Sequence, residues 1–182
     1  GDASKGKNGT TLMSCEIFRD VVSNGKTTTK GGRTYSAIIW AADHGAVICQ
    51  NSWSYVVDTN GDKVISDEER ANALKRQIGY WDKRAIDYFI DYAGCDKDGK
   101  QLPDSPMKGG LVVFAAGNDN LANGAPANYE PVVAVAALTS NGSKASYSNY
   151  GDFVDLAAPG SNIYSTLPGG TYGNMSGTSM AC

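Results

Sequence analysis

Apolar segments that alternate between strand length and helix length constrain the fold of this chain more than any other feature. Four of them are apolar throughout and predict strands, at residues 11–18, 46–53, 109–118 and 131–138. Two others predict helices, from apolar spacing or a glycine at the expected end, at residues 32–46 and 79–94. Strands without polar alternation are typical of sheets buried on both faces. The sequence therefore predicts an α/β fold with a parallel sheet covered by helices on both faces.

Length and charge exclude several classes of protein. At 182 residues the chain is one domain or most of one, long enough to bury roughly 70% of its unfolded surface. Its 16 basic and 19 acidic residues give a net charge of −3 and form no basic stripe or polybasic segment. Nucleic acid and charged membrane surfaces are therefore not expected as partners. The longest apolar runs, such as 132–138, are too short to span a bilayer.

The four cysteines leave the redox compartment open. None belongs to a C-x-x-C pair, which disfavours zinc binding and thioredoxin-like chemistry. Cys15 and Cys49 lie in apolar runs, where a free thiol behaves as a small hydrophobic side chain. Buried free thiols, and one or more disulfides among Cys15, Cys49, Cys95 and Cys182, are both compatible with the sequence.

Two polar side chains are candidates for chemistry. Ligands of parallel sheets bind beyond the carboxyl ends of the strands, which places residues 50–54 and 115–119 at the mouth of a site. Asn118 follows a run of small residues there, and a fixed asparagine can donate hydrogen bonds to a developing oxyanion. Ser179 lies in NMSGTSMAC, at 174–182, which lacks the second glycine of a G-x-S-x-G motif. Taken alone, each also has a simpler interpretation, Asn118 as a turn residue and Ser179 as a helix N-cap.

Taken together, several segments resemble the subtilisin-family serine proteases, the subtilases. GTSMA at 177–181 resembles the signature around the nucleophile of that family, and VVFAAGND at 112–119 resembles the strand that carries its oxyanion asparagine. Further segments match in order and spacing, at 47–54, 125–138, 147–151 and 154–170. The resemblance extends from about residue 11 to residue 182 and is interrupted by one insertion, at 56–78.

The resemblance implies a role for each matched segment. Ser179 is then the nucleophile of a serine endopeptidase, and Asn118 donates to the oxyanion with the Ser179 backbone N–H, assisted by Thr178. The substrate is a peptide or protein, in an extracytoplasmic or secreted setting. The resemblance implies two groups of substrate-binding residues. The backbone of Ser52, Trp53 and Ser54 would pair with the substrate as with an added strand. One wall of the pocket for the side chain before the cut bond would consist of Ala115, Ala116 and Gly117. Trp53 is expected to frame the site rather than take part in chemistry. A cis bond between Ala125 and Pro126 is also implied.

The catalytic base is not among the matched residues. A serine nucleophile needs a base and a group that orients the base. The single histidine, His44, ends an expected helix and has no H-G-T motif around it. In the family the aspartate and histidine precede the segment that 11–18 resembles. The chain is therefore expected to be the C-terminal portion of a catalytic domain, incomplete at both ends, truncated just after the nucleophile and inactive by itself. The alternative is a non-catalytic module, derived from a subtilase, that binds peptides or calcium.

The insertion contains a second candidate site, DTNGDKVISDEE at 58–69. Its spacing matches an EF-hand calcium loop, and the expected ligands are Asp58, Asn60, Asp62, the Val64 carbonyl and a bidentate Glu69. Lys63 stands where the pattern has glycine, so it is expected to adopt a positive φ. The alternative is a solvated acidic loop that leads into the N-terminus of a helix. Calcium is the one cofactor that the sequence suggests, and the chemistry at Ser179 needs none.

Overall fold

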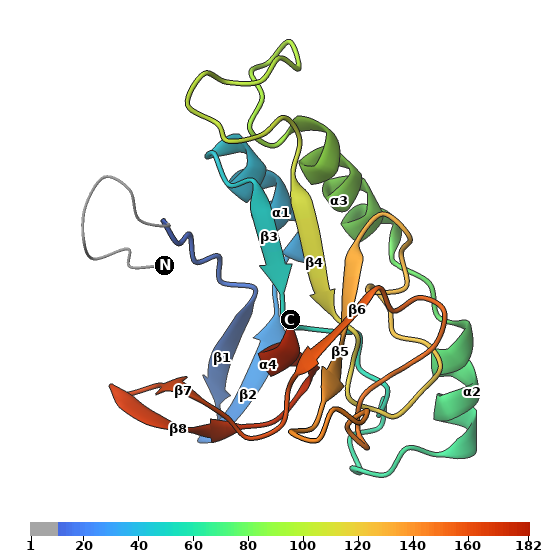
Figure 1. The fold of residues 1–182 in the computed structure, drawn as a ribbon. Helices are drawn as coiled ribbons and strands as arrows, with labels where there is room; N and C mark the ends of the chain where they lie inside the picture. Colours follow the sequence, from blue (N-terminus) through green and yellow to red (C-terminus); the bar gives the residue numbers. More distant parts are fainter. Residues whose placement is uncertain (1–10) are drawn as a thin grey trace.

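A four-stranded parallel sheet forms the centre of the protein (Figure 1). The structure is a computed structural model that describes residues 11–182. The strands, in their spatial order, are β3 (Ile48–Asn51), β4 (Leu111–Ala115), β5 (Val133–Leu138) and β6 (Leu156–Pro159). Each neighbouring pair is parallel, with Asn51 opposite Phe114 and Ala115 opposite Val135. The predicted parallel sheet is confirmed.

Helices cover both faces of this sheet, as predicted. The helices are α1 (Thr34–Asp43), α2 (Asp67–Lys75), α3 (Tyr80–Tyr92) and α4 (Thr178–Ala181). Of these, α2 packs instead in a separate small cluster with Val57 and Leu121. The largest core cluster joins Ile38 of α1 and Phe89 of α3 to Ala134 of β5. Successive residues of a strand point to opposite faces, so Ala137 faces away from Ala134. That opposite face is covered by α4, because the space beside Gly160 lies between the Cβ atoms of Ala137 and Ala181 (Figure 1).

The predicted strand at 11–18 is wrong. Residues 11–17 have no regular structure, and β1 (Phe18–Ser23) starts only at Phe18 and pairs antiparallel with β2 (Lys26–Gly31). A strand needs a partner for its backbone N–H and C=O groups. In residues 11–182 the sheet ends at β3 on that side, and Leu12 is 85% exposed. Residues 11–18 are largely apolar, but no neighbouring strand is present to pair with them in the described part of the chain.

Two further features lie outside the central sheet. The loop-rich region after Gly142 contains a second hairpin of β7 (Ile163–Leu167) and β8 (Thr171–Met175), and β8 leads directly to α4. The bond between Ala125 and Pro126 is cis, as the resemblance implies.

None of the helices in the described residues is long and apolar enough to cross a membrane.

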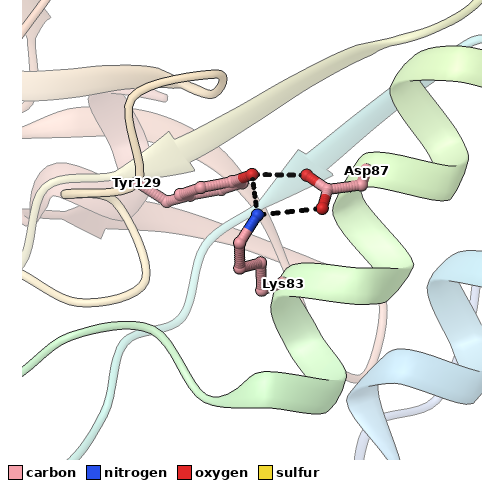
Figure 2. A network of polar contacts seen from close by, with 3 residues as sticks. All are labelled: Lys83, Asp87 and Tyr129. Atoms are coloured by element: carbon pink, nitrogen blue, oxygen red, sulfur yellow. Dashed lines mark hydrogen bonds and ion pairs between the residues drawn. The ribbon is translucent and has the colours of Figure 1, made fainter.

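A polar network fixes α3 to the segment between β4 and β5 (Figure 2). Lys83 Nζ lies 3.0 Å from Asp87 Oδ2 on α3, and both residues bond the hydroxyl of Tyr129. The ammonium also lies over the Tyr129 ring, 4.4 Å from its centroid. Burial, followed by the bond to Asp87, raises the pKa of Tyr129, which keeps the phenol neutral. The network therefore fixes Tyr129, near the end of the segment that connects β4 to β5, against α3.

The four cysteines are free thiols, and each is partly buried. Cys15 and Cys49 pack against the main core cluster, as expected for thiols that act as small hydrophobic side chains. Burial raises the pKa of Cys49 and of Cys182, which favours the unreactive thiol form of both.

Candidate active site

The site lies where β3 and β4 end and α4 begins (Figure 1). The Thr178 backbone N–H donates to Asn118 Oδ1 at 2.8 Å, which joins α4 to the end of β4. Ser52 Oγ donates to the Ser179 carbonyl at 3.1 Å, which joins α4 to the end of β3. The structure thus brings Ser179 to Ser52 and Asn118, which the sequence placed at the carboxyl edge of a parallel sheet.

The amide of Asn118 has one defined orientation. Its Oδ1 accepts two bonds from Thr178, from the backbone N–H at 2.8 Å and from Oγ1 at 2.9 Å. A backbone N–H can only donate, so the oxygen must be the atom that faces Thr178. The Asn118 side chain is exposed, and within residues 11–182 its Nδ2 has no hydrogen-bond acceptor. Both N–H groups of the amide are therefore free to donate to a ligand.

Thr178 connects the two sides of this arrangement. The residue is completely buried, and its Oγ1 accepts from the Gly117 N–H at 3.2 Å while donating to Asn118. The hydroxyl therefore has both a donor and an acceptor partner, as a buried hydroxyl requires. Thr178 therefore holds Gly117 and the Asn118 oxygen together.

Ser179 is the second residue of α4 and is half-buried. Its Oγ donates to the Ser52 carbonyl at 3.4 Å, which is long for an O–H···O bond. No imidazole contacts it in the described residues, because His44 Nδ1 pairs with the Trp40 carbonyl at 2.7 Å and its ring stacks on Trp40. His44 precedes β3 and Ser52 follows it, so a strand of about 13 Å separates them. His44 is therefore not placed as the base for Ser179.

The segment predicted to bind substrate directly follows β3 and has no regular secondary structure. Ser52 is exposed, and Trp53 and Ser54 are half-buried. The Trp53 ring packs edge-on against Phe114 with centroids 5.1 Å apart, and its indole N–H donates to Asn51 Oδ1 at 3.1 Å. This packing agrees with a framing role for Trp53. The sequence did not single out Asn51, a buried amide that fixes the start of this segment through Trp53 and the Val113 carbonyl.

The small residues before Asn118 allow close packing at the end of β4. Ala115 and Ala116 are buried, and Gly117 has a φ of 107°, which favours glycine. A Cβ at Gly117 would lie 2.3 Å from Asn149 Nδ2, so no larger residue fits. Asp119, the next residue after Asn118, lines a crevice with Ser54. Burial raises the pKa of Asp119, and Arg70 opposes this shift.

The acidic loop at 58–69 satisfies its own carboxylates. Asp58 accepts from the backbone of Gly61 and Lys63, and Asp62 accepts from Val64. Lys63 has a φ of 68°, as expected at the glycine position of the pattern. The exit helix α2 begins directly after Ser66, which caps it.

Glu69 does not fit a bidentate cation ligand in this conformation. Its Oε1 accepts from the Thr59 N–H, the Thr59 hydroxyl and the Asn60 N–H, and its Oε2 accepts from the N–H and hydroxyl of Ser66. These bonds, those from Ser66 first, lower the pKa of Glu69 to about 2. Across residues 11–182, no three His, Cys, Asp or Glu side chains converge as a metal site.

Comparison with known proteins identifies the class. A model of the subtilase family, peptidase S8, matches residues 2–182, and the chain belongs to that family of serine peptidases. It is 56% identical over 75 residues to thermitase of Thermoactinomyces vulgaris, covering 41% of this chain and 27% of that protein. It is 52% identical over 130 residues to a thermophilic serine proteinase of Bacillus sp. strain AK1, covering 69% of this chain and 31% of that protein.

Solved structures agree on the fold. The chain resembles the prenylagaramide maturation protease PagA with a TM-score of 0.58 and 26% identity, over 85% of this chain and 46% of that one. A cold-adapted subtilisin-like serine proteinase matches with a TM-score of 0.54 and 27% identity, over 84% of this chain and 44% of that one. The chain therefore spans less than half the length of these relatives.

Proposed function

We propose that this chain forms the part of a serine endopeptidase that carries the nucleophile Ser179 and the oxyanion donor Asn118. The observation that supports this most is the orientation of the Asn118 amide. Its oxygen is held by Thr178, the residue before Ser179, and its N–H groups are free beside the nucleophile. A donor that is fixed before substrate arrives costs no reorganisation during the reaction.

In the proposed mechanism Ser179 Oγ attacks the carbonyl carbon of the scissile peptide bond while its proton passes to a base. The tetrahedral intermediate then breaks the C–N bond, the base gives the proton to the departing amine, and water hydrolyses the resulting acyl-enzyme. The carbonyl oxygen gains negative charge, which Asn118 Nδ2 and the Ser179 backbone N–H stabilise by hydrogen bonds. That N–H is in the first turn of α4, where backbone donors have no partner within the helix. The base that takes the Ser179 proton would come from residues outside this chain, so residues 1–182 alone would be inactive.

The substrate would be a peptide or protein bound in extended form along Ser52, Trp53 and Ser54. Outside the β3–β4 ladder, the backbones of Ser52, Trp53 and Ser54 make no backbone–backbone hydrogen bond within residues 11–182. Their N–H groups and the carbonyls of Trp53 and Ser54 are therefore available to an added strand, while the Ser52 carbonyl accepts the long bond from Ser179 Oγ. Ala115, Ala116 and Gly117 would form one wall of the pocket for the side chain before the cut bond. A secreted or extracytoplasmic location is proposed as well, by analogy with relatives such as an extracellular protease of Xanthomonas campestris.

A second proposal is that the loop at 58–69 binds Ca²⁺. The observation that favours it is the positive φ of Lys63, the conformation that the loop pattern requires at that position. Asp58, Asn60, Asp62 and the Val64 carbonyl would be ligands, and Glu69 would join them only after exchanging its bonds to Thr59 and Asn60.

The proposed activity is tested in the full-length protein that contains this chain, with a peptide library or casein as substrate. Ser179→Ala should abolish turnover, leaving only the roughly 10³ to 10⁴-fold acceleration over water that an oxyanion hole and binding supply. Ser165→Ala, at an exposed serine of β7, is the matched control and should retain activity. Full activity of Ser179→Ala would refute the proposal and favour a non-catalytic binding module.

A further inference from the structure

We propose that Asn149 is a positioning residue that, through hydrogen bonds to its backbone, holds the loop at 116–121, which carries the oxyanion donor Asn118. Asn149 lies between β5 and β6, remote in sequence from that loop, and is 2% exposed. This inference rests on the proposed function, because it gives Asn149 a catalytic consequence through Asn118 alone.

The side chain of Asn149 uses its full hydrogen-bonding capacity, two N–H donors and two acceptor positions. Its Oδ1 accepts from the backbone N–H groups of Asp119 and Leu121, each at 3.0 Å. Its Nδ2 donates to the carbonyl oxygens of Ala116 and Asn123, each at 3.0 Å. All four partners are backbone groups of fixed polarity, so the amide has one orientation, and a carboxylate or an alkyl group cannot replace it.

These contacts lie on both sides of Asn118 in the chain. Ala116 and Gly117 precede it, and the Asn149 backbone N–H also donates to the Gly117 carbonyl at 2.9 Å. Asp119 follows it. Because a Cβ at Gly117 would come within 2.3 Å of Asn149 Nδ2, the loop rests directly on this side chain. The Cα position of Asn118 is therefore fixed by Asn149.

Asn149 and Thr178 act on different ends of the same residue. Thr178 holds the amide oxygen of Asn118, and Asn149 holds the backbone from which that amide projects. The loop has no helix or strand ladder at residues 116–121, so much of its backbone depends on Asn149 for partners. A displacement of about 1 Å at a reacting group can cost on the order of 10²-fold in rate.

The test uses Asn149→Asp and Asn149→Ala in the full-length protein. Asp keeps the shape and the acceptor positions but places an anion against two carbonyl oxygens, and Ala leaves space that water can fill. We expect kcat to fall about 10 to 100-fold with KM changed less than about 3-fold, because an oxyanion donor acts mainly in the transition state. Asn128→Ala is the matched control. Asn128 Nδ2 donates to the Arg76 carbonyl and to Asn123 Oδ1, outside residues 116–121, so kcat should be unchanged even where the melting temperature falls.

A double-mutant cycle separates positioning from general stability. If Asn149 acts through Asn118, then Asn149→Asp in the Asn118→Ala background should lower kcat less than about 2-fold. Equal losses of kcat in both backgrounds would overturn the proposal.

Hydrogen exchange of the unsubstituted protein keeps the proposal testable if the variants do not fold. The Asp119 and Leu121 amides should exchange far more slowly than the amide of Lys97, an exposed turn residue whose N–H has no hydrogen-bond partner within residues 11–182. Exchange as fast as at Lys97 would show that the bonds to Asn149 are absent, and would overturn the proposal. An unsubstituted protein without hydrolysis refutes the proposed function and this role with it. An active protein whose kcat is insensitive to Asn149 refutes this role alone.

Discussion

The nucleophile site and the acidic loop are both polar regions at chain turns, but their hydrogen bonds are organised in opposite ways. At the nucleophile site, the partners of the bonds from Thr178 to Asn118 and from Ser52 to Ser179 are 60 and 127 residues apart. In the acidic loop, the partners of Asp58, Asp62 and Glu69 are 2 to 10 residues apart. The first region exists only when the sheet is assembled, whereas the second can form locally.

The two regions also differ in what remains free for a ligand. Buried groups hold the oxygen of Asn118 and leave its N–H donors available. In the acidic loop the carboxylate of Glu69 is already saturated by Thr59, Asn60 and Ser66. A group is preorganised for chemistry when its inert end is held and its reactive end is not. By this criterion Asn118 is ready to act, and Glu69 must give up bonds before it can bind a cation.

Removing the free donor should have the largest effect. In the full-length protein, Asn118→Ala is expected to lower kcat about 10² to 10³-fold with little change in KM. Subtilisin itself is the reference case for that magnitude. Steady-state kinetics on a peptide substrate measure it. An effect mainly on KM would mean that Asn118 binds ground state and transition state alike.

Calcium binding should distinguish the acidic loop from the nucleophile site, because Glu69 must give up hydrogen bonds before it can bind the ion. We expect the full-length protein to melt at a higher temperature in Ca²⁺ than in EDTA, with a stabilisation of about 2.7 kcal/mol at a hundred times Kd. Lys63→Gly should tighten binding by relieving the positive φ and removing a cation beside the ion, and Glu69→Gln should weaken it. Equal melting temperatures with and without Ca²⁺ would leave the loop as a solvated acidic turn.

Removing one hydrogen bond to the amide oxygen of Asn118 should lower kcat less than removing its N–H donor. Thr178→Val keeps the shape and the backbone N–H bond but removes the hydroxyl that Asn118 and Gly117 share. One neutral hydrogen bond is worth about 1 kcal/mol, so kcat should fall roughly 5-fold. Thr166→Val, at an exposed residue of β7, is the control. An unchanged kcat for Thr178→Val would show that the backbone bond alone orients the amide.

The smallest expected effect is that of acid on the stability of the loop. The pKa of Glu69 is lowered to about 2 from an ordinary value of 4.5. A depressed pKa contributes stability that is fully present above about pH 4.5 and is lost as the pH falls toward 2. Glu69→Gln should remove that part of the pH dependence in denaturant titrations, and Glu68→Gln, at an exposed neighbour, should keep it. Identical pH profiles for Glu69→Gln and the unsubstituted protein would contradict the assignment.

The sheet could be predicted from the sequence, because uninterrupted apolar runs mark buried parallel strands. The geometry of such sheets also placed residues 50–54 and 115–119 at one edge. The meeting of Asn118 with Ser179 was implied only by the resemblance to the subtilases. The strand at 11–18 was predicted wrongly, because an apolar run does not reveal whether a neighbouring strand is present.

The supporting contacts could not be predicted. Asn149 is an ordinary turn residue by sequence, and only the fold shows that the loop of Asn118 rests on it. The saturation of Glu69 was missed for a related reason. The capping box of α2 and the calcium-loop pattern both use a glutamate at this position, and the sequence does not decide between them.

The central claim is that Ser179 is a nucleophile activated from outside this chain, and fluorophosphonate labelling with peptide mapping tests it most directly. The full-length protein should take up one equivalent of label on Ser179 and none in the Ser179→Ala variant. Residues 1–182 alone should not be labelled, because a serine hydroxyl without its base is not activated. Labelling of another residue in the full-length protein, or stoichiometric labelling of Ser179 in residues 1–182 alone, would contradict the account.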